Sequence, residues 1–493
     1  MTKANSLILL VRSLSKVEKK TIYLRSAVTK NTKDYITLFK IIDKQKITDS
    51  KKLSETFSNQ CPYAAFIPTV KYLYDYILRV LVDIKQNQDK EYELYNNILV
   101  SKILLERNLN SDYSSFIQQL QRNTEEQGNY NLLLILRRME LDHILLDGFD
   151  GVTEKDLLHK QNKINDTLKI LRQINEQSYL YEMLRYRIEK FQYAGSSLKL
   201  QAFNDLIISE ISLTSNLRNN IFQINKLHQL FQANYLISIG DYKSALNSFS
   251  ELNKLFINNQ KQWNNPPVYY VMVIEGILES LKRIKRYDEM KYYLDNLRQL
   301  EHPSVYFQTS LRCIEFIYSA IPYLERNEYA ACLPLLEKYK EVLINKIEYL
   351  KPQQYLSLSL YIAIIYLMNN KLDLARKQLT HIINSDSYHD IWVFRPIQLI
   401  NLIIYYKKGD FDYVISGVRS IKRRNKLSNK KLRIESLLFY FFSLDLKYMP
   451  PAKRKAISEK FEQDIKSIEF NIEERRMLSV FDFPKWIISH FEK

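Results

Sequence analysis

The sequence predicts an all-α fold, a solenoid of antiparallel helix pairs, and three observations support this prediction. The 493 residues include only 8 Gly and 12 Pro, so the chain is poor in the residues that form the tight turns of β-sheets and phosphate-binding loops. Hydrophobic residues make up 46% of the chain, which is enough for a large buried core. From about residue 225 onward the apolar residues recur at a regular interval, as they do in repeat proteins.

Five copies of one pattern follow one another between about residues 225 and 425. In each copy a helix ends in a polar turn, and a second helix opens with an aromatic or large apolar residue. The position three residues after this opening residue is the crossing position, and it holds a small residue in three of the copies. Successive opening residues are 45, 42, 43 and 39 residues apart, a period near 42. The opening residues are Tyr242, Tyr287, Tyr329, Leu372 and Phe411, and the crossing positions hold Ala245, Met290, Cys332, Ala375 and Val414.

Each residue type in the pattern has a structural role. A small residue at the crossing position, such as Ala245, lets the second helix approach the first closely. The opening residue and the large apolar residue seven positions later, Tyr242 and Phe249 in the first copy, share one helical face. Gly240 lets the chain reverse between the two helices. Because each pair leaves an apolar face open, we expect the pairs to stack.

Three positions predict departures from regular packing. Met290 and Val414 place bulkier side chains at the crossing position, which predicts wider spacing in those two pairs. Pro334 falls inside the second helix of the third copy, where its ring and missing N–H predict a kink or a late helix start.

The stretches Gly240-Asp-Tyr-Lys-Ser-Ala245 and Lys371-Leu-Asp-Leu-Ala375 resemble the tetratricopeptide-repeat (TPR) family, and the resemblance covers roughly residues 225–425. The family's repeat is about 34 residues long, so a period near 42 implies extended helices. The resemblance implies a right-handed solenoid whose first helices line a concave groove for a peptide or helix of a protein partner. The opening stretch Leu10–Lys20 also resembles the start of uncharacterised bacterial solenoid proteins. The candidate groove residues are Asn234, Tyr269, Tyr270, Tyr361 and Tyr405.

Composition and periodicity divide the whole chain into four helical segments. We predict a basic helical N-terminal segment over residues 1–85, divergent helical hairpins over 86–224, TPR-like repeats over 225–425, and a C-terminal helical cap with a basic loop over 426–493. Tyr113 lies 129 residues before Tyr242, or three steps of 43, which favours an array that starts before residue 225. In the N-terminal segment we expect helices at 5–14, 15–28, 32–43, 50–58 and 64–84.

The formal net charge of +17 is concentrated at the two ends of the chain. Residues 1–60 carry a balance of +8 and residues 419–461 a balance of +10, so the long middle is nearly neutral. Basic regions attract nucleic acid and acidic proteins. A solvated loop between helices is the alternative interpretation of the C-terminal run. Candidate contacts to an anionic partner in this run are Arg419, Lys422, Arg423, Arg424, Lys426, Lys430, Lys431 and Arg433.

The helices expected at 50–58 and 64–84 follow the order of a helix-turn-helix. In that arrangement Lys71 and Arg79 would lie near the phosphates of a bound nucleic acid. The start of the longer helix, Ala64-Ala-Phe66, is apolar, whereas a reading helix offers polar side chains at its start. A helical cap that closes the first open face of the solenoid is the alternative.

The sequence contains no motif for catalysis, a cofactor or a metal. Its seven His show no metal-ligand spacing, and it has neither a glycine-rich phosphate loop nor a Gly-x-Ser-x-Gly elbow. Cys61, Cys313 and Cys332 form no Cys-x-x-Cys pair, which suits a reducing compartment. The apolar run Leu7–Val11 is too short for a signal peptide, and nowhere do about 18 apolar residues run unbroken. We expect a cytoplasmic protein without enzymatic activity, cofactor, metal, membrane span or small-molecule substrate.

Two functions remain open at this point. The first is a protein-binding scaffold that holds a peptide or helix in the groove of the TPR-like solenoid. The second is a nucleic-acid-associated or transcription-related regulator that binds through the basic N- and C-terminal regions.

Overall fold

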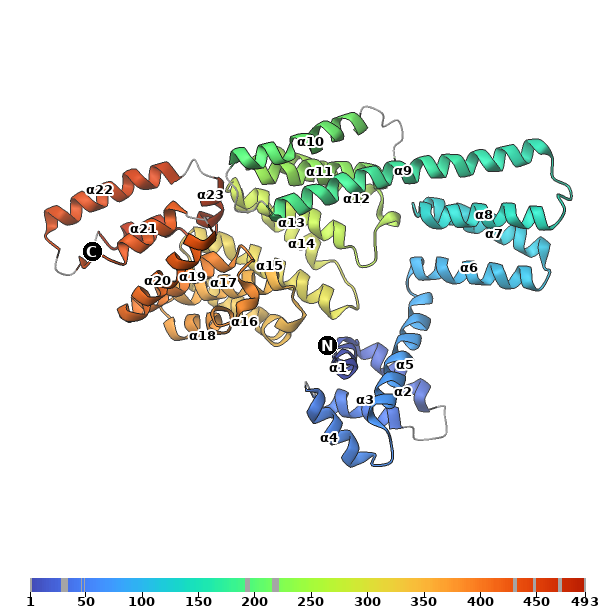
Figure 1. Ribbon diagram of the computed structural model, residues 1–493, viewed down its shortest axis with the longest axis horizontal. Helices are drawn as coiled ribbons and strands as arrows, with labels where there is room; N and C mark the ends of the chain where they lie inside the picture. Colours follow the sequence, from blue (N-terminus) through green and yellow to red (C-terminus); the bar gives the residue numbers. More distant parts are fainter. Residues whose placement is uncertain are drawn as a thin grey trace. The chain divides into compact units, whose positions relative to one another are not determined.

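The computed structural model describes residues 2–27, 34–45, 47, 49–190, 196–214, 221–428, 432–446, 449–468 and 472–491. Within these residues the fold is all-helical, with 24 α-helices, five short 3₁₀ helices and no strand (Figure 1). This confirms the predicted all-α class. Among the described helices, none combines the length and the apolar composition that a membrane crossing requires.

The chain folds as two compact units. The first comprises residues 1–173 together with the short stretches 260–267 and 301–308, and the second comprises residues 174–259, 268–300 and 309–493. The long helix α9 (Glu154–Lys190) contributes to both. The four segments predicted from the sequence divide the chain differently and stay a prediction.

The first five helices pack around a core of their own within the first unit. Leu7, Phe39, Phe57 and Leu73 are among its fully buried residues. The positions of the helices match the five expected in residues 1–85 to within a few residues. They are α1 (Lys3–Ser13), α2 (Lys16–Ala27), α3 (Asp34–Gln45), α4 (Ser50–Gln60) and α5 (Phe66–Gln86).

Three consecutive helices continue the first unit: α6 (Lys90–Glu106), α7 (Asn110–Glu126) and α8 (Tyr130–Leu146). Tyr113 is fully buried between them, and its hydroxyl donates a hydrogen bond to the carbonyl of Met139 at 3.0 Å. Because α7 begins at Asn110, Tyr113 lies in the crossing position of this pair. The sequence pattern had placed it at the opening position, three residues away.

The second unit contains the five predicted helix pairs in order (Figure 1). Each second helix begins at the predicted opening residue, either directly or through a 3₁₀ turn at Tyr287 and at Tyr329, which confirms the five starts. The first helices are α11 (Phe222–Ile239), α13 (Val268–Arg283), α15 (Val305–Glu325), α17 (Pro352–Met368) and α19 (Phe394–Lys408). The second helices are α12 (Tyr242–Asn258), α14 (Met290–Arg298), α16 (Cys332–Leu343), α18 (Leu372–Ile383) and α20 (Phe411–Ser428).

The turn inside each pair has the same backbone geometry. Two positions before the opening residue, the chain adopts a positive φ of 57–84°. The next residue donates its N–H to the carbonyl five positions earlier at 2.8–3.1 Å, the bond of a Schellman motif. Only two of these turns use Gly, so the sequence indicated the left-handed backbone at two of the five turns. The positive-φ residues are Gly240, Lys285, Asn327, Asn370 and Gly409.

The crossing positions are buried in all five pairs, as their role requires. The pairs with Ala at this position, α11–α12 and α17–α18, are the most extensively packed of the five. The pair α15–α16 is packed less extensively despite the small Cys332, so the wider spacing expected at Met290 and Val414 stays a prediction. Pro334 lies in the first turn of α16, so the predicted late start is confirmed. The opening residues are half-buried except Phe411, which is 55% exposed and contacts the ring of Tyr406.

A second close approach joins successive pairs. Gly276 of α13 faces the ring of Phe249 of α12, and a Cβ at this position would lie 2.3 Å from the ring. The absence of a side chain at Gly276 therefore lets the second helix of one pair pack against the first helix of the next.

Five further helices complete the second unit. At its N-terminal end α10 packs against α11, and at its C-terminal end α21, α22 and α24 pack on one another. The apolar core of the last two pairs continues into this C-terminal group and includes Phe441, Phe461, Phe483 and Ile487. The helices are α10 (Ser196–Thr214), α21 (Arg433–Phe441), α22 (Pro451–Ile468), α23 (Ile472–Leu478) and α24 (Phe483–Ile488).

Candidate protein-binding face

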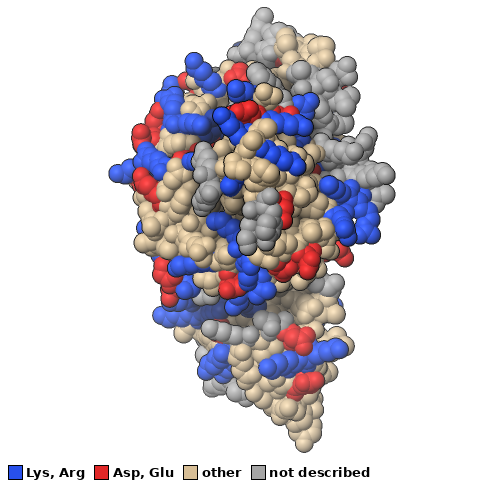
Figure 2. Space-filling model, turned by 90° about the vertical axis from the view of Figure 1, so that its left-hand side faces the viewer, with Lys and Arg blue, Asp and Glu red and all other residues tan. Residues whose placement is uncertain are grey.

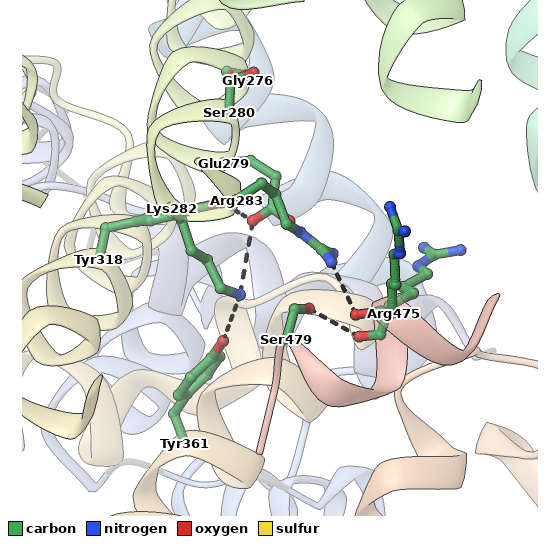
Figure 3. A network of polar contacts seen from close by, with 10 residues as sticks. Gly276, Glu279, Ser280, Lys282, Arg283, Tyr318, Tyr361, Arg475 and Ser479 are labelled. Atoms are coloured by element: carbon green, nitrogen blue, oxygen red, sulfur yellow. Dashed lines mark hydrogen bonds and ion pairs between the residues drawn. The ribbon is translucent and has the colours of Figure 1, made fainter. Parts of the chain in front are cut away.

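A connected set of polar side chains lies on the first helices of the second, third and fourth pairs (Figure 3). We call it the polar seam. Helix α13 is mostly apolar, and its buried face includes Val273, Ile277 and Leu281. Its charged residues recur at positions i, i+4 and i+7 to i+8, so they share one side of the helix. The connected residues of the seam are Glu279, Lys282 and Arg283 of α13, Tyr318 of α15 and Tyr361 of α17, and we include Glu275, which lies one turn before Glu279 on α13.

Glu279 is the centre of the seam. One of its carboxylate oxygens accepts a hydrogen bond from Nε of Arg283 at 2.6 Å. The other accepts one from the hydroxyl of Tyr318 at 3.2 Å and lies 3.8 Å from Nζ of Lys282. Lys282 donates in turn to the hydroxyl of Tyr361 at 2.9 Å. One carboxylate thus links three successive first helices (Figure 3).

The two carboxyl groups of α13 have opposite electrostatic environments. Burial opposes the ionisation of Glu279, but Lys282 and Arg283 outweigh it and lower the pKa of Glu279 to about 2. Burial, and then the Glu279 carboxylate, raise the pKa of Glu275 to about 7, against the opposing effect of Arg185 and Lys351. Glu279 is therefore ionised at neutral pH, whereas Glu275 is divided between its charged and neutral forms.

Glu275 is the member of the seam that stands apart. Within the described part of the chain, no hydrogen bond or ion pair engages its half-buried carboxyl group. Arg185 of α9, which lowers the pKa of Glu275 electrostatically, donates its hydrogen bond to the side-chain oxygen of Asn234 on α11 at 2.9 Å. A half-buried carboxyl group of this kind can accept a donor from outside the chain.

The five groove residues predicted from the sequence are divided between the core and this face. Tyr361 belongs to the seam, whereas Asn234 accepts a hydrogen bond from Arg185 of α9 and makes no hydrogen bond with a described residue of the seam. Tyr270 is buried, 4% exposed, and packs in the core against Phe256. Tyr269 lies under the ammonium group of Lys226 at 4.4 Å, and Tyr405 stacks on Tyr413 at 3.6 Å.

The sequence analysis did not identify Glu275, Glu279, Lys282, Arg283 or Tyr318. A signal was present, because charged residues recurring at helical spacing in a mostly apolar helix are unusual in a core. Their links to Tyr318 and Tyr361 could not be predicted, since those residues lie 39 and 79 positions away from their partners in the sequence.

The basic C-terminal run is helical for the most part. Residues 419–428 form the end of α20, which corrects the expectation of a loop there, and Lys430 and Lys431 lie outside the described residues. Arg419, Lys422 and Arg423 are exposed, as is Arg424, whose guanidinium contacts His389 at 3.1 Å.

The last two candidate residues of that run are Arg433 and Lys426. Arg433 is exposed at the start of α21, and Lys426 lies in α20, although its side chain is not described. On the face shown in Figure 2, the described Lys and Arg residues are interspersed with Asp and Glu. The basic residues therefore form no area of a single charge on this face.

Lys71 and Arg79 are both exposed on α5. The start of this helix presents Ile67, which is 79% exposed, and the preceding turn presents the fully exposed Tyr63. The apolar character that the sequence predicted for this helix start is therefore retained at the surface.

Among the described residues, no group of three or more His, Cys, Asp or Glu side chains is placed to hold a metal ion. Comparisons of the chain with protein-family models, with curated proteins and with solved structures find no match.

Proposed function

We propose that the protein is a non-catalytic, TPR-like scaffold that binds a peptide or helix of a protein partner on the first helices of its repeats. In this proposal the helix pairs form a right-handed solenoid. The observation that supports it is the polar seam, which extends across three repeats and includes an unengaged, half-buried carboxyl group at Glu275. Burying polar groups costs desolvation energy, which offsets much of the stability that their contacts provide. A row of such groups is therefore better explained by recognition of a partner than by stability alone.

The proposal is tested by partner capture with a charge reversal. Glu275→Arg changes the seam without removing any of its internal hydrogen bonds, and we expect it to reduce recovery of specific partners from the native host at least fivefold. The matched control is Glu337→Arg on α16, because Glu337 is exposed and pairs only with Lys340 on its own helix. Partners are identified by mass spectrometry. Equal recovery by both variants and the wild type would place the binding face elsewhere.

The alternative is a nucleic-acid-associated regulator, and the exposed Arg419, Lys422 and Arg423 on α20 favour it. A salt titration of binding to duplex and single-stranded DNA and RNA tests this function. Binding that weakens steeply with salt and is lost in the variant K422E/R423E/R424E supports it. Absence of binding at low salt contradicts it.

We place the scaffold in the cytoplasm. Cys61, Cys313 and Cys332 are all free thiols, and Cys313 and Cys332 are buried in the second unit. Unpaired cysteines persist most readily in a reducing compartment. Fractionation of the native host followed by immunodetection tests this location, and recovery in a secreted fraction contradicts it.

A further inference from the structure

The C-terminal helix α23 lies beside the polar seam (Figure 3). Nη1 of Arg283 donates a hydrogen bond to the carbonyl of Arg475 at 3.2 Å. The guanidinium of Arg476 lies over the ring of Trp392, which precedes α19, at 4.1 Å. Farther along, Nζ of Lys485 contacts the side chain of Asn327 at 3.1 Å, in the turn of the third pair. The segment from α23 to α24 therefore spans elements of the second, third and fifth pairs.

Helices α23 and α24 are held in different ways. Phe483, Trp486 and Ile487 of α24 are buried in the apolar core of the last pairs. Helix α23 buries Met477, and the half-buried Leu478 packs against the same core, but most of its remaining contacts are made by charged residues. Glu474 accepts hydrogen bonds from the backbone N–H groups of Arg433 and Ile434, and Arg475 and Arg476 make the contacts given above. A helix of seven residues is unstable by itself in water. Its structure therefore depends on the surface that it covers.

The match between α23 and the seam is incomplete. Helix α23 offers a backbone carbonyl to Arg283, but none of its described side chains engages Glu275. A partner helix that makes the same contacts and also brings a basic side chain to Glu275 would gain a charge-assisted hydrogen bond that α23 lacks. Such a helix has a physical basis for replacing α23.

We propose that α23 is an internal ligand of the polar seam, and that the protein's partner presents a short helix of the same kind, carrying a basic residue for Glu275, which displaces α23. This inference rests on the proposed function, because it assigns the partner to the same face. It adds the chemical class of the partner, a short amphipathic helix of mixed charge like α23 with one additional basic residue for Glu275, and it makes binding conditional on release of the chain's own C-terminal segment.

The first test measures whether the seam accepts α23 as a separate molecule. The probe is a fluorescein-labelled peptide with the sequence of residues 472–482, and its binding to the full chain is followed by fluorescence anisotropy. The double variant R476A/K485A removes two side-chain contacts of the internal segment and leaves the apolar residues of α24 in place. We expect it to bind the peptide at least tenfold more tightly than the wild type. Equal binding overturns the proposal.

The matched control is Lys340→Ala, which removes only an exposed contact with Glu337. We expect this variant to bind the peptide as the wild type does. Hydrogen exchange then measures residues 472–478 and 483–488 separately in the double variant. Faster exchange confined to 472–478 supports release of α23 alone. Equal acceleration in both segments identifies α23 as a fixed part of the core and overturns the proposal.

A lysine scan of the probe tests the role of Glu275. Each peptide carries one additional Lys, and we expect at least one of them to bind R476A/K485A tenfold more tightly than the parent peptide. This gain should disappear when Glu275→Gln is added. No gain at any position overturns the proposed partner chemistry. If the peptides behave as expected but Glu275→Arg does not affect partner capture, α23 occupies the seam and the proposed function of the seam fails.

Discussion

The polar seam and the C-terminal end of the second unit both hold neighbouring helices together, but they do so with different side chains. At the C-terminal end, Phe441 contacts Tyr406, Trp486 and His490 at ring distances of 5.3–5.6 Å, and we call this set the aromatic cap. The seam joins its helices through charged and hydroxyl groups around Glu279. Aromatic burial stabilises a fold directly, whereas buried ion pairs contribute little net stability because desolvation offsets their attraction. The cap therefore accounts for stability, and the seam is better explained by specificity.

The largest effect is expected in the aromatic cap. Phe441→Ala removes a fully buried ring and should lower the free energy of unfolding by about 3–5 kcal/mol, measured by chemical denaturation. The control is Tyr440→Ala at the next position, which is 43% exposed and should cost about 1 kcal/mol or less. Similar losses in the two variants would show that the cap does not carry the stability assigned to it.

A smaller loss is expected in the seam. Glu279→Gln keeps the shape of the side chain but leaves Lys282 and Arg283, which are 8% and 10% exposed, without their anion. Because Glu279 itself is 24% exposed, water offsets part of the loss, and we expect about 1–3 kcal/mol in the same assay. Glu337→Gln on the surface serves as the control, with a change below about 0.5 kcal/mol. A gain in stability would mean that the cost of desolvating the Glu279 carboxylate exceeds its attraction to Lys282 and Arg283.

The approach of α12 to α13 should respond to a single added methyl group. Gly276→Ala places its Cβ against the rigid ring of Phe249 and should cost about 1–3 kcal/mol. Gly417→Ala is the comparison, because it meets only a terminal methyl group of Leu402, which can rotate away. We expect a smaller loss there, and adding Phe249→Leu to Gly276→Ala should recover part of its loss. An equal loss in the two glycine variants would indicate an effect of the helix backbone rather than of the ring.

The smallest effect concerns Glu275 and depends on pH, because water around its half-buried carboxyl group reduces the energetic consequence of its pKa shift. Its pKa is about 7 in the folded chain and about 4.5 in the unfolded chain, so the folded state binds the proton more tightly. Stability should therefore fall as pH rises from about 4.5 to about 7, and stay constant above that range with respect to this group. Glu275→Gln removes this pH dependence. We expect the variant to have a higher melting temperature than the wild type at pH 8 and the same melting temperature as the wild type at pH 4.5. The same difference at both pH values would refute the assignment to Glu275.

The helix pairs could be predicted from the sequence because the residue patterns that mark their starts are local. Tyr242, Leu372 and Phe411 each mark a helix start, since an apolar position after a polar turn is a short-range pattern. The left-handed backbone at Lys285, Asn327 and Asn370 could not be predicted, because residues with a side chain seldom adopt a positive φ and the sequence around them carries no glycine to mark it. Tyr113 was assigned to the wrong position because α7 begins with the polar residue Asn110, so the first aromatic residue after the turn is not the opening residue.

The composition and periodicity of this chain determined its helical class and the step of its repeats, because helix formation and pairwise stacking depend on residues that are near in sequence. Only the tertiary structure decided which polar residues meet. Glu279 reaches Tyr318 on the next first helix, and Arg283 reaches Arg475, which is 192 residues away. Contacts at such separations follow from the stacking of whole helices and leave no periodic pattern in the sequence. The seam and the segment beside it therefore became visible only in the folded molecule.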